Sequence, residues 1–102
     1  MSIKNLSRKT QISKNDLRFV LYLYENERYT DAIENAGILI SHFPQAEELY
    51  NIRGAAEARL DRFSEAVKNY QKAIELNPKY AEAYNNLGNA LRNSGYLSQA
   101  IL

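Results

Sequence analysis

The sequence contains no cysteine in 102 residues and only one histidine. The lack of cysteine excludes disulfides, thiol nucleophiles and thiolate metal sites. The sequence also lacks any apolar run near the roughly 20 residues that a transmembrane helix needs, so no membrane partner is expected. The N-terminus, MSIKNLSRKTQISKND, has no hydrophobic stretch like that of a secretory signal peptide. We therefore expect a cytoplasmic protein.

A strong net charge is also lacking, since 13 Lys and Arg face 12 Asp and Glu. Residues 1–18 are a basic exception, with a net charge of +4. Proteins that bind single-stranded nucleic acid stack bases on aromatic side chains. This stretch has no aromatic residue, since the first in the chain is Phe19. We therefore interpret residues 1–12 as a solvated basic arm and expect no nucleic-acid partner.

Residues that commonly carry catalysis are scarce or poorly arranged. No Gly-rich phosphate loop, HExxH or Gly-x-Ser-x-Gly motif occurs. His42 falls at an expected helix end, where a capping or dipole role is the simpler interpretation. The neighbours Glu47 and Glu48 fall at an expected helix start, where acidic residues complement the helix dipole. We predict that the chain is not an enzyme and uses neither a metal nor an organic cofactor.

What the sequence does contain is a repeat of 34 residues. Shifted by 34, the chain matches itself without a gap, so that Ala32 aligns with Ala66 and Ala100, and Pro44 with Pro78. A period of this length is typical of a helix–turn–helix repeat. Each unit divides into two amphipathic segments of about a dozen residues. The predicted helices are 14–26, 30–42, 47–60, 63–76, 81–94 and 97 onward.

Small residues at repeated places indicate where helices approach closely. Gly54 and Gly88 fall in the middle of first helices, where glycine costs up to about 1 kcal/mol relative to alanine. That cost is explained if a neighbouring helix lies against each glycine. Gly95 is placed to end a helix in the left-handed conformation. Large residues fill the remaining space, and the tyrosines expected at core places are Tyr22, Tyr50, Tyr70 and Tyr84.

The segments FSEAVKNYQKAIELNPKYAEAY and YNNLGNALRNSGYLSQAI resemble the tetratricopeptide repeat (TPR). In the second unit, Arg53 departs from the family by standing where leucine is usual. The first unit is degenerate, with Val20 and Ala36 where glycine and an aromatic residue are expected. The resemblance implies an all-α fold, a right-handed α-α superhelix of about two and a half antiparallel helix pairs. The implied divisions are a basic N-terminal arm (1–12), a degenerate first repeat (13–46), a second repeat (47–80) and a truncated third repeat (81–102).

In the family that this chain resembles, the first helix of each pair lines a concave groove that contacts bound peptides. The resemblance therefore implies a partner-binding groove built from the three first helices. Its residues are Leu17, Leu21, Tyr24, Asn51, Ala55, Arg59, Asn85, Asn86, Asn89, Arg92 and Asn93.

Asparagines are the unusual part of this groove. Asn85, Asn89 and Asn93 are spaced four apart, so on a helix they form one polar stripe. A side-chain amide offers two donors and an acceptor, which suits binding to an extended peptide backbone. Asn86 and Asn89 resemble the amides that line the TPR array of O-GlcNAc transferase. The alternative that these amides only satisfy neighbouring groups between repeats stays open.

The family also has a clamp for C-terminal carboxylates, which needs Lys, Asn and Arg at set places on the first helices. At those places this chain has Leu17, Leu21, Ile52, Glu82 and Asn86. A receptor for chaperone tails is therefore not expected.

We predict a protein–protein interaction module that binds an extended peptide or protein partner in the groove. Two alternatives stay open. The run FPQAEELYNIRGAA, followed by PKYAEAYNNLGNAL, resembles N-terminal TPR arrays of bacterial proteins that carry a downstream sulfotransferase or glycosyltransferase domain. This resemblance implies a targeting or substrate-recognition arm of a larger transferase. The other alternative is a self-assembling scaffold.

Two further expectations concern the ends of the chain. The apolar strip of Leu17, Leu21 and Tyr24 is expected to hold residues 1–12, through Ile3, Leu6 or Ile12, or to anchor a hydrophobic side chain of a partner. The third unit stops at Leu102, early in its second helix, so we expect a fragment of a longer array. Its exposed C-terminal repeat face is expected to form a homo-oligomer.

Overall fold

The computed structural model describes residues 11–95, which form five α-helices and no β-strand. The helices are α2 (Lys14–Glu25), α3 (Tyr29–His42), α4 (Glu47–Arg59), α5 (Phe63–Leu76) and α6 (Ala81–Asn93). Each helix begins and ends within one residue of the segment predicted from the 34-residue period. The all-α prediction is therefore confirmed. The helix expected from residue 97 lies outside the described residues.

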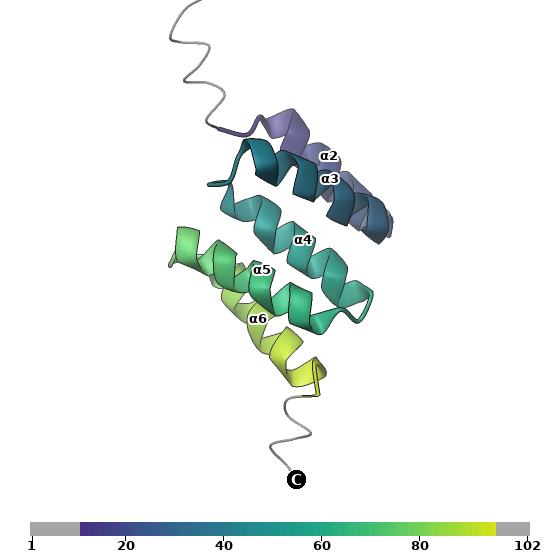
Figure 1. Ribbon diagram of the computed structural model, residues 1–102, viewed down its shortest axis with the longest axis vertical. Coiled ribbons are helices and arrows are strands. Elements are labelled where there is room, and N and C mark those ends of the chain that lie inside the picture. Colours follow the sequence, from purple (N-terminus) through teal and green to yellow (C-terminus); the bar gives the residue numbers. More distant parts are fainter. Residues whose placement is uncertain (1–10, 96–102) are drawn as a thin grey trace, which may run out of the picture.

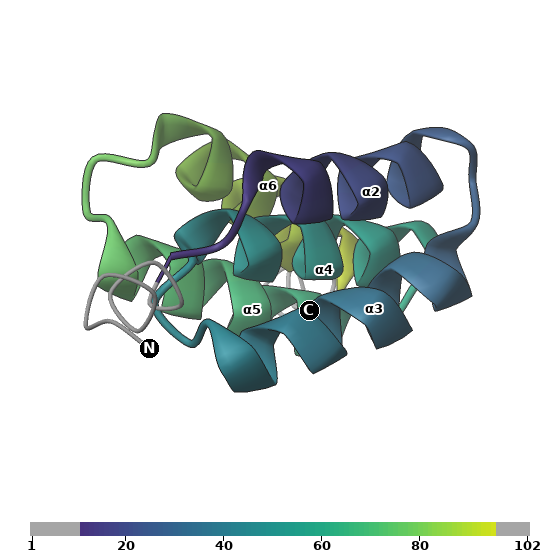
Figure 2. The same ribbon diagram turned by 90° about the horizontal axis from the view of Figure 1, so that it is seen from above.

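The five helices form two layers joined by short connections. The first helices of the pairs, α2, α4 and α6, make one layer, and the second helices α3 and α5 make the other (Figures 1 and 2). Each connection has three or four residues, so consecutive helices are antiparallel neighbours. The central helix α4 contacts all four others. This is the architecture of stacked helix pairs that the resemblance implied.

The turn inside each helix pair contains one residue in the left-handed conformation. Glu27 has a φ of 62°, Asp61 a φ of 61° and Gly95 a φ of 89°. These residues occupy the same place in three successive repeats. In the first two turns, the next residue donates its N–H to a carbonyl five residues back, at 2.8 and 2.9 Å, as in a Schellman motif. The prediction for Gly95 is confirmed, and at the two equivalent places residues with side chains adopt the same conformation.

Close packing within the second helix pair depends on Gly54. A Cβ atom placed on Gly54 would lie 2.8 Å from Cε1 of Tyr70 and 3.2 Å from the carbonyl oxygen of Ala66. The close approach predicted at this glycine is therefore confirmed. At Gly88, no side chain and no atom of another helix among residues 11–95 lies within 4 Å of such a Cβ, its chain neighbours apart. The helix expected to pack against Gly88 lies outside the described residues.

In the first helix pair, the large and the small side chain at the equivalent contact are exchanged between the two helices. Val20 occupies the place of Gly54, and Ala36 occupies the place of Tyr70. Both residues are fully buried in one cluster with Leu49. The larger side chain of this pair therefore lies on the first helix and the smaller one on the second. The two substitutions that make this unit degenerate in sequence are complementary in volume.

Two of the four tyrosines expected in the core are exposed. Tyr50 and Tyr70 are buried, whereas Tyr22 is 57% exposed and Tyr84 is 50% exposed. Within residues 11–95, the prediction that Tyr22 and Tyr84 lie in the core is therefore wrong. The reason is that α2 and α6 are the outermost first helices of the described stack, and no described helix covers their outer faces.

Ile12 precedes α2 and is half-buried. It packs against the core cluster around Val20, to which Leu17 also contributes. The expectation that the strip of Leu17, Leu21 and Tyr24 holds residues 1–12 or anchors a partner stays a prediction. Ile3 and Leu6, the other two candidates for that role, lie outside the described residues.

Candidate functional site

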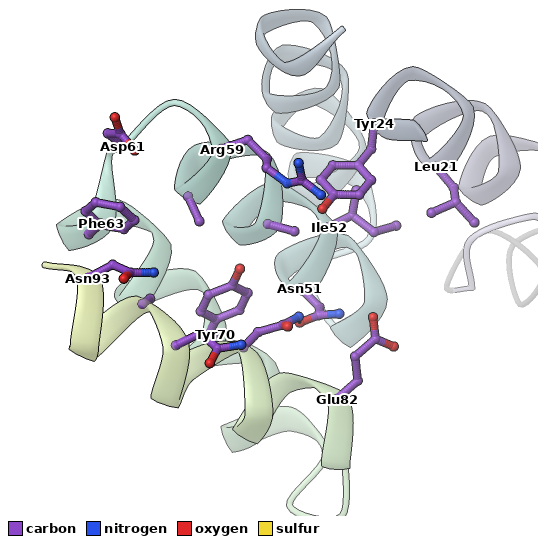
Figure 3. Close-up of a pocket in the computed structure, with 15 residues that line it drawn as sticks. Leu21, Tyr24, Asn51, Ile52, Arg59, Asp61, Phe63, Tyr70, Glu82 and Asn93 are labelled. Atoms are coloured by element: carbon purple, nitrogen blue, oxygen red, sulfur yellow. The ribbon is translucent and has the colours of Figure 1, made fainter. Parts of the chain in front are cut away.

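A cavity of about 860 Å³ lies on the side of the molecule formed by the first helices (Figure 3). We call this cavity the groove. Its lining comes from α2, α4 and α6, from α5, and from the turn before α5. The lining residues are Leu21, Tyr24, Asn51, Ile52, Ala55, Ala58, Arg59, Asp61, Phe63, Tyr70, Glu82, Asn86, Asn89, Ala90 and Asn93.

The structure brings together eight of the eleven residues predicted for the groove. These are Leu21, Tyr24, Asn51, Ala55, Arg59, Asn86, Asn89 and Asn93. Leu17 is half-buried and packs instead against the core cluster around Val20. Asn85 and Arg92 are exposed but do not line the cavity. A partner-binding role for any of the eleven stays a prediction.

The face of α6 that lines the groove is displaced from the predicted stripe. It consists of Glu82, Asn86, Asn89 and Asn93, at spacings of four, three and four. Because one helical turn is 3.6 residues, each step of four overshoots a full turn by about 40°. A strict row of four therefore winds off the face, whereas alternating steps of four and three stay on it. Asn86 therefore shares a face with Asn89 and Asn93, and the packing of α6 on the other helices turns this face toward the groove.

Asn51 and Asn86 form a bridge of amides between α4 and α6. The Asn51 side chain is only 3% exposed. Its Nδ2 donates to the Tyr80 hydroxyl at 3.3 Å, and its Oδ1 accepts from Nδ2 of Asn86 at 3.1 Å. Burial is the main cause that raises the pKa of Tyr80 to about 12, so this hydroxyl stays protonated at neutral pH. For these two amides the structure favours the structural role, because they join successive repeats.

The other two groove amides are less engaged by the fold. Arg92 donates a hydrogen bond to Oδ1 of Asn89. The Nδ2 group of Asn89 has no hydrogen-bond partner among residues 11–95, and neither does the side chain of Asn93. Hydrogen-bonding capacity in the groove is therefore left for a bound molecule.

On the α4 side of the groove, Arg59 lies over two tyrosine rings. Its Cζ is 5.8 Å from the ring centroid of Tyr24 and 5.9 Å from that of Tyr29. The two rings meet edge to face, with centroids 5.6 Å apart. A side-chain hydrogen bond with Tyr24 raises the pKa of Arg59, so the guanidinium stays positively charged. Stacking on aromatic faces restricts the orientation of the guanidinium.

Tyr70 reaches the groove from a second helix, which the prediction from first helices missed. Its ring lies against Gly54, and its hydroxyl points into the groove (Figure 3). The residue is only 2% exposed, and this burial raises the pKa of its hydroxyl. Ala90 was also missed, although its spacing of four from Asn86 indicates the same face. Asp61 belongs to the turn between α4 and α5, and Phe63 is the first residue of α5.

A metal centre is not found in the part of the chain that the structure describes. No group of three or more His, Cys, Asp or Glu residues between residues 11 and 95 is arranged to hold a metal ion. Within the same range, none of the helices combines the length and the apolar character required to cross a membrane.

Comparisons with known proteins place the chain in a family. Residues 17–68 match a family model described as a tetratricopeptide repeat. Residues 54–95 match a second model, described as a TPR repeat. The two matches together run from α2 to the turn after α6. The chain therefore belongs to the tetratricopeptide repeat family, as its period and its fold indicate.

Three curated relatives illustrate the range of proteins in which similar repeats occur. The small glutamine-rich tetratricopeptide repeat-containing protein 2 of Mycosarcoma maydis is 32% identical over 73 residues, which are 72% of this chain and 21% of that protein. A probable UDP-N-acetylglucosamine–peptide N-acetylglucosaminyltransferase of Arabidopsis thaliana is 34% identical over 95 residues, 91% of this chain and 10% of that protein. The peroxisomal targeting signal receptor of Candida albicans is 35% identical over 77 residues, 76% of this chain and 13% of that protein. The chain thus spans between about a tenth and a fifth of the length of these relatives.

Proposed function

We propose that this chain is a protein-interaction module and that an extended segment of a partner protein binds in the groove. The observation that carries the proposal is the groove lining. Around a cavity of about 860 Å³ the lining presents amide, guanidinium and hydroxyl groups. Residues 11–95 leave part of the hydrogen-bonding capacity of these groups unsatisfied. A volume of this order is typical of a ligand site. An extended peptide backbone needs such donors and acceptors along its length.

The names of the relatives support the same function. The Candida albicans relative is named as a receptor for a targeting signal, which is a recognition role. Because one fold serves many functions, the proposal depends on a direct binding test.

A library of random peptides displayed on phage is a suitable probe for the full chain. We expect selection to recover binding peptides, and a double variant, Asn89→Ala with Asn93→Ala, to bind them at least about tenfold more weakly. Asn85→Ala is the matched control, because this exposed amide of the same helix does not line the groove. All three proteins should have equal thermal midpoints. Recovery of no binding peptide, or equal binding by the double variant, would overturn the proposal.

The similarity to the Arabidopsis glycosyltransferase over 95 residues favours a second candidate function. In this case the repeats would be a substrate-recognition arm of a larger transferase. The test is the complete reading frame that contains this chain. If that frame encodes a transferase domain, removal of residues 13–95 should lower transfer to protein acceptors and leave transfer to a short acceptor unchanged. A reading frame without such a domain would rule this candidate out.

We further propose that the repeats have no catalytic role of their own and act in the cytoplasm. Microscopy of the tagged full-length protein checks the location.

A further inference from the structure

Two side chains bring hydrogen-bond donors to the groove and form no ion pair there. They are the guanidinium of Arg59, from the last turn of α4, and the hydroxyl of Tyr70, from α5 (Figure 3). Neither residue stands at a position that the family's clamp for C-terminal carboxylates uses. Their surroundings indicate the kind of group that would bind between them.

The Tyr70 side chain is almost wholly buried, but its hydroxyl reaches the surface of the groove and is unpaired among residues 11–95. Tyr70 is 2% exposed, yet its hydroxyl forms no hydrogen bond with any residue between 11 and 95. By contrast, the hydroxyl of Tyr50 donates to the carbonyl oxygen of Pro44 at 2.9 Å, and that of Tyr80 accepts from Asn51. The hydroxyl of Tyr70 instead faces the groove, where its O–H can donate to a bound acceptor. A donor held in this way is set up for an acceptor that enters the groove.

The Arg59 guanidinium is fixed in place but has no counter-ion. Tyr24 and Tyr29 hold it through contacts of 5.8 and 5.9 Å to their ring centroids. The ion pairs among residues 11–95 are formed by other residues, and none brings a carboxylate within 4 Å of Arg59. Asp61 lines the same groove and is not paired with it. Beyond its hydrogen bond with Tyr24, the guanidinium keeps donors for a bound group.

We propose that Arg59 and Tyr70 form a subsite for one carboxylate of the bound segment, either an Asp or Glu side chain or a C-terminal carboxylate. This inference rests on the proposed function. A carboxylate is an acceptor with two oxygens, so one can receive the planar guanidinium while the other receives the phenolic O–H. The groove also contains the carboxylates of Asp61 and Glu82. These repel a doubly charged phosphate more strongly than a singly charged carboxylate.

Of the first two repeats, only the second has the residues to build this subsite. Ala36 occupies the place of Tyr70 in the first repeat and has no hydroxyl. Glu25 occupies the place of Arg59 there, with the opposite charge. The described groove therefore contains a single subsite of this kind, which would fix the register of a bound segment.

The test uses peptides selected on the full-length wild-type chain from a random display library with free C-termini. We expect an Asp or Glu at one fixed position, or a fixed distance to the C-terminus. A selected peptide is then compared with its Glu→Gln or Asp→Asn form and with its C-terminal amide, which separates the two sources of the carboxylate. The form that lacks the recognised carboxylate should bind wild type about tenfold more weakly or worse.

Variants of the protein complete the cycle. Arg59→Gln and Tyr70→Phe should each weaken binding of the acidic peptide, with Arg59→Gln losing about tenfold, and should leave binding of the neutral peptide unchanged. Tyr70→Phe keeps the ring against Gly54, so its thermal midpoint should stay near that of wild type. Arg18→Gln is the matched control, because it removes an exposed charge from α2 outside the groove.

The outcomes separate this inference from the function on which it rests. Selected peptides that bind but show no preferred carboxylate would overturn the subsite and keep the module. Equal losses for the acidic and neutral peptides in Arg59→Gln would also overturn it. Failure to select any peptide would overturn both.

Discussion

The ring of Tyr70 lies directly against Gly54, so closely that a Cβ at residue 54 would come within 2.8 Å of the ring carbon Cε1. This contact joins the second helix pair, and it also lets a residue of α5 point its hydroxyl into the groove. A single glycine on α4 therefore serves both the core and the candidate site.

The complementary sizes of residues 54 and 70 can be tested by giving them the residue types that the first repeat has at the equivalent positions, valine and alanine. Gly54→Val alone should lower the free energy of unfolding by about 1–3 kcal/mol, because the valine collides with the Tyr70 ring. Adding Tyr70→Ala should recover part of that loss, because Val20 and Ala36 pack together in this way. Urea denaturation of the two single variants and the double variant measures the coupling. Strictly additive losses would contradict the size exchange.

Gly37→Ala is the matched control for Gly54→Val. Gly37 lies within α3, and a Cβ there would be 3.5 Å from the nearest atom, which belongs to the flexible Arg53 side chain. Alanine should therefore raise the free energy of unfolding by up to about 1 kcal/mol through its higher helix propensity.

Asn51 should contribute to stability rather than to binding alone. Asn51→Ala removes the hydrogen bonds to Tyr80 and Asn86 and leaves half-buried groups of both residues unpaired, so we expect a loss of about 1–3 kcal/mol. The exposed Asn85→Ala should change the free energy of unfolding by less than about 0.5 kcal/mol. Thermal and urea unfolding of both variants gives the comparison. Equal stability of the two would show that the bridge is unimportant.

The left-handed turn residues offer a way to stabilise the fold. At Glu27, with a φ of 62°, a glycine would relieve the steric cost of about 1–2 kcal/mol that a side chain has in this conformation. Part of that gain is cancelled by the greater freedom of glycine in the unfolded chain. We expect Glu27→Gly to raise the free energy of unfolding by up to about 1 kcal/mol. Asn26→Gly, at a φ of −95°, should lower it, and a loss in both variants would contradict the argument.

Glu57 should make stability depend on pH. Its side chain is buried, accepts a hydrogen bond from Asn69 at 2.6 Å and lies 3.8 Å from Nε of Arg53. Burial raises the pKa of this carboxyl, while Asn69, Arg53 and Arg62 partly oppose the shift and Glu65 adds to it. The folded state therefore holds this proton to higher pH than the unfolded state does. The stability that it contributes is complete at acidic pH and is lost as pH rises through the folded pKa.

The measurement is urea unfolding of wild type and Glu57→Gln from about pH 4 to about pH 7. The glutamine stays neutral, so the stability of this variant should rise relative to wild type as pH increases. Glu34→Gln removes an exposed charge that does not act on the pKa of Glu57 and is the control. A difference between Glu57→Gln and wild type that does not change with pH would contradict the assignment.

Self-association through the third repeat stays a prediction. On α6, Tyr84 is 50% exposed and Leu91 is 38% exposed. Two such faces can pair around a two-fold axis. Light scattering at tens of micromolar should therefore detect a dimer, and Leu91→Glu should disperse it. A monomer at all concentrations would exclude this association, and Arg92→Glu, at an exposed place next to Leu91, controls for the added charge.

Much of the fold was predictable from the sequence because its causes are local. The 34-residue period, the amphipathic spacing and the prolines at 44 and 78 locate each helix, since helix formation depends mainly on nearby residues. Gly54 could be interpreted in the same way, because glycine inside a helix needs a reason. The candidate groove was partly predictable through the family resemblance, which pointed to the first helices.

The tertiary structure alone decided which polar groups meet in the groove. The choice of Asn86 over Asn85 depends on the rotation of α6 against α4, and a uniform spacing of four does not reveal that rotation. The hydroxyl of Tyr70 reaches the groove only because two helices approach closely at Gly54. The exposure of Tyr22 likewise depends on which helices cover α2. These features are set by contacts between residues far apart in the sequence, so no local pattern contains them.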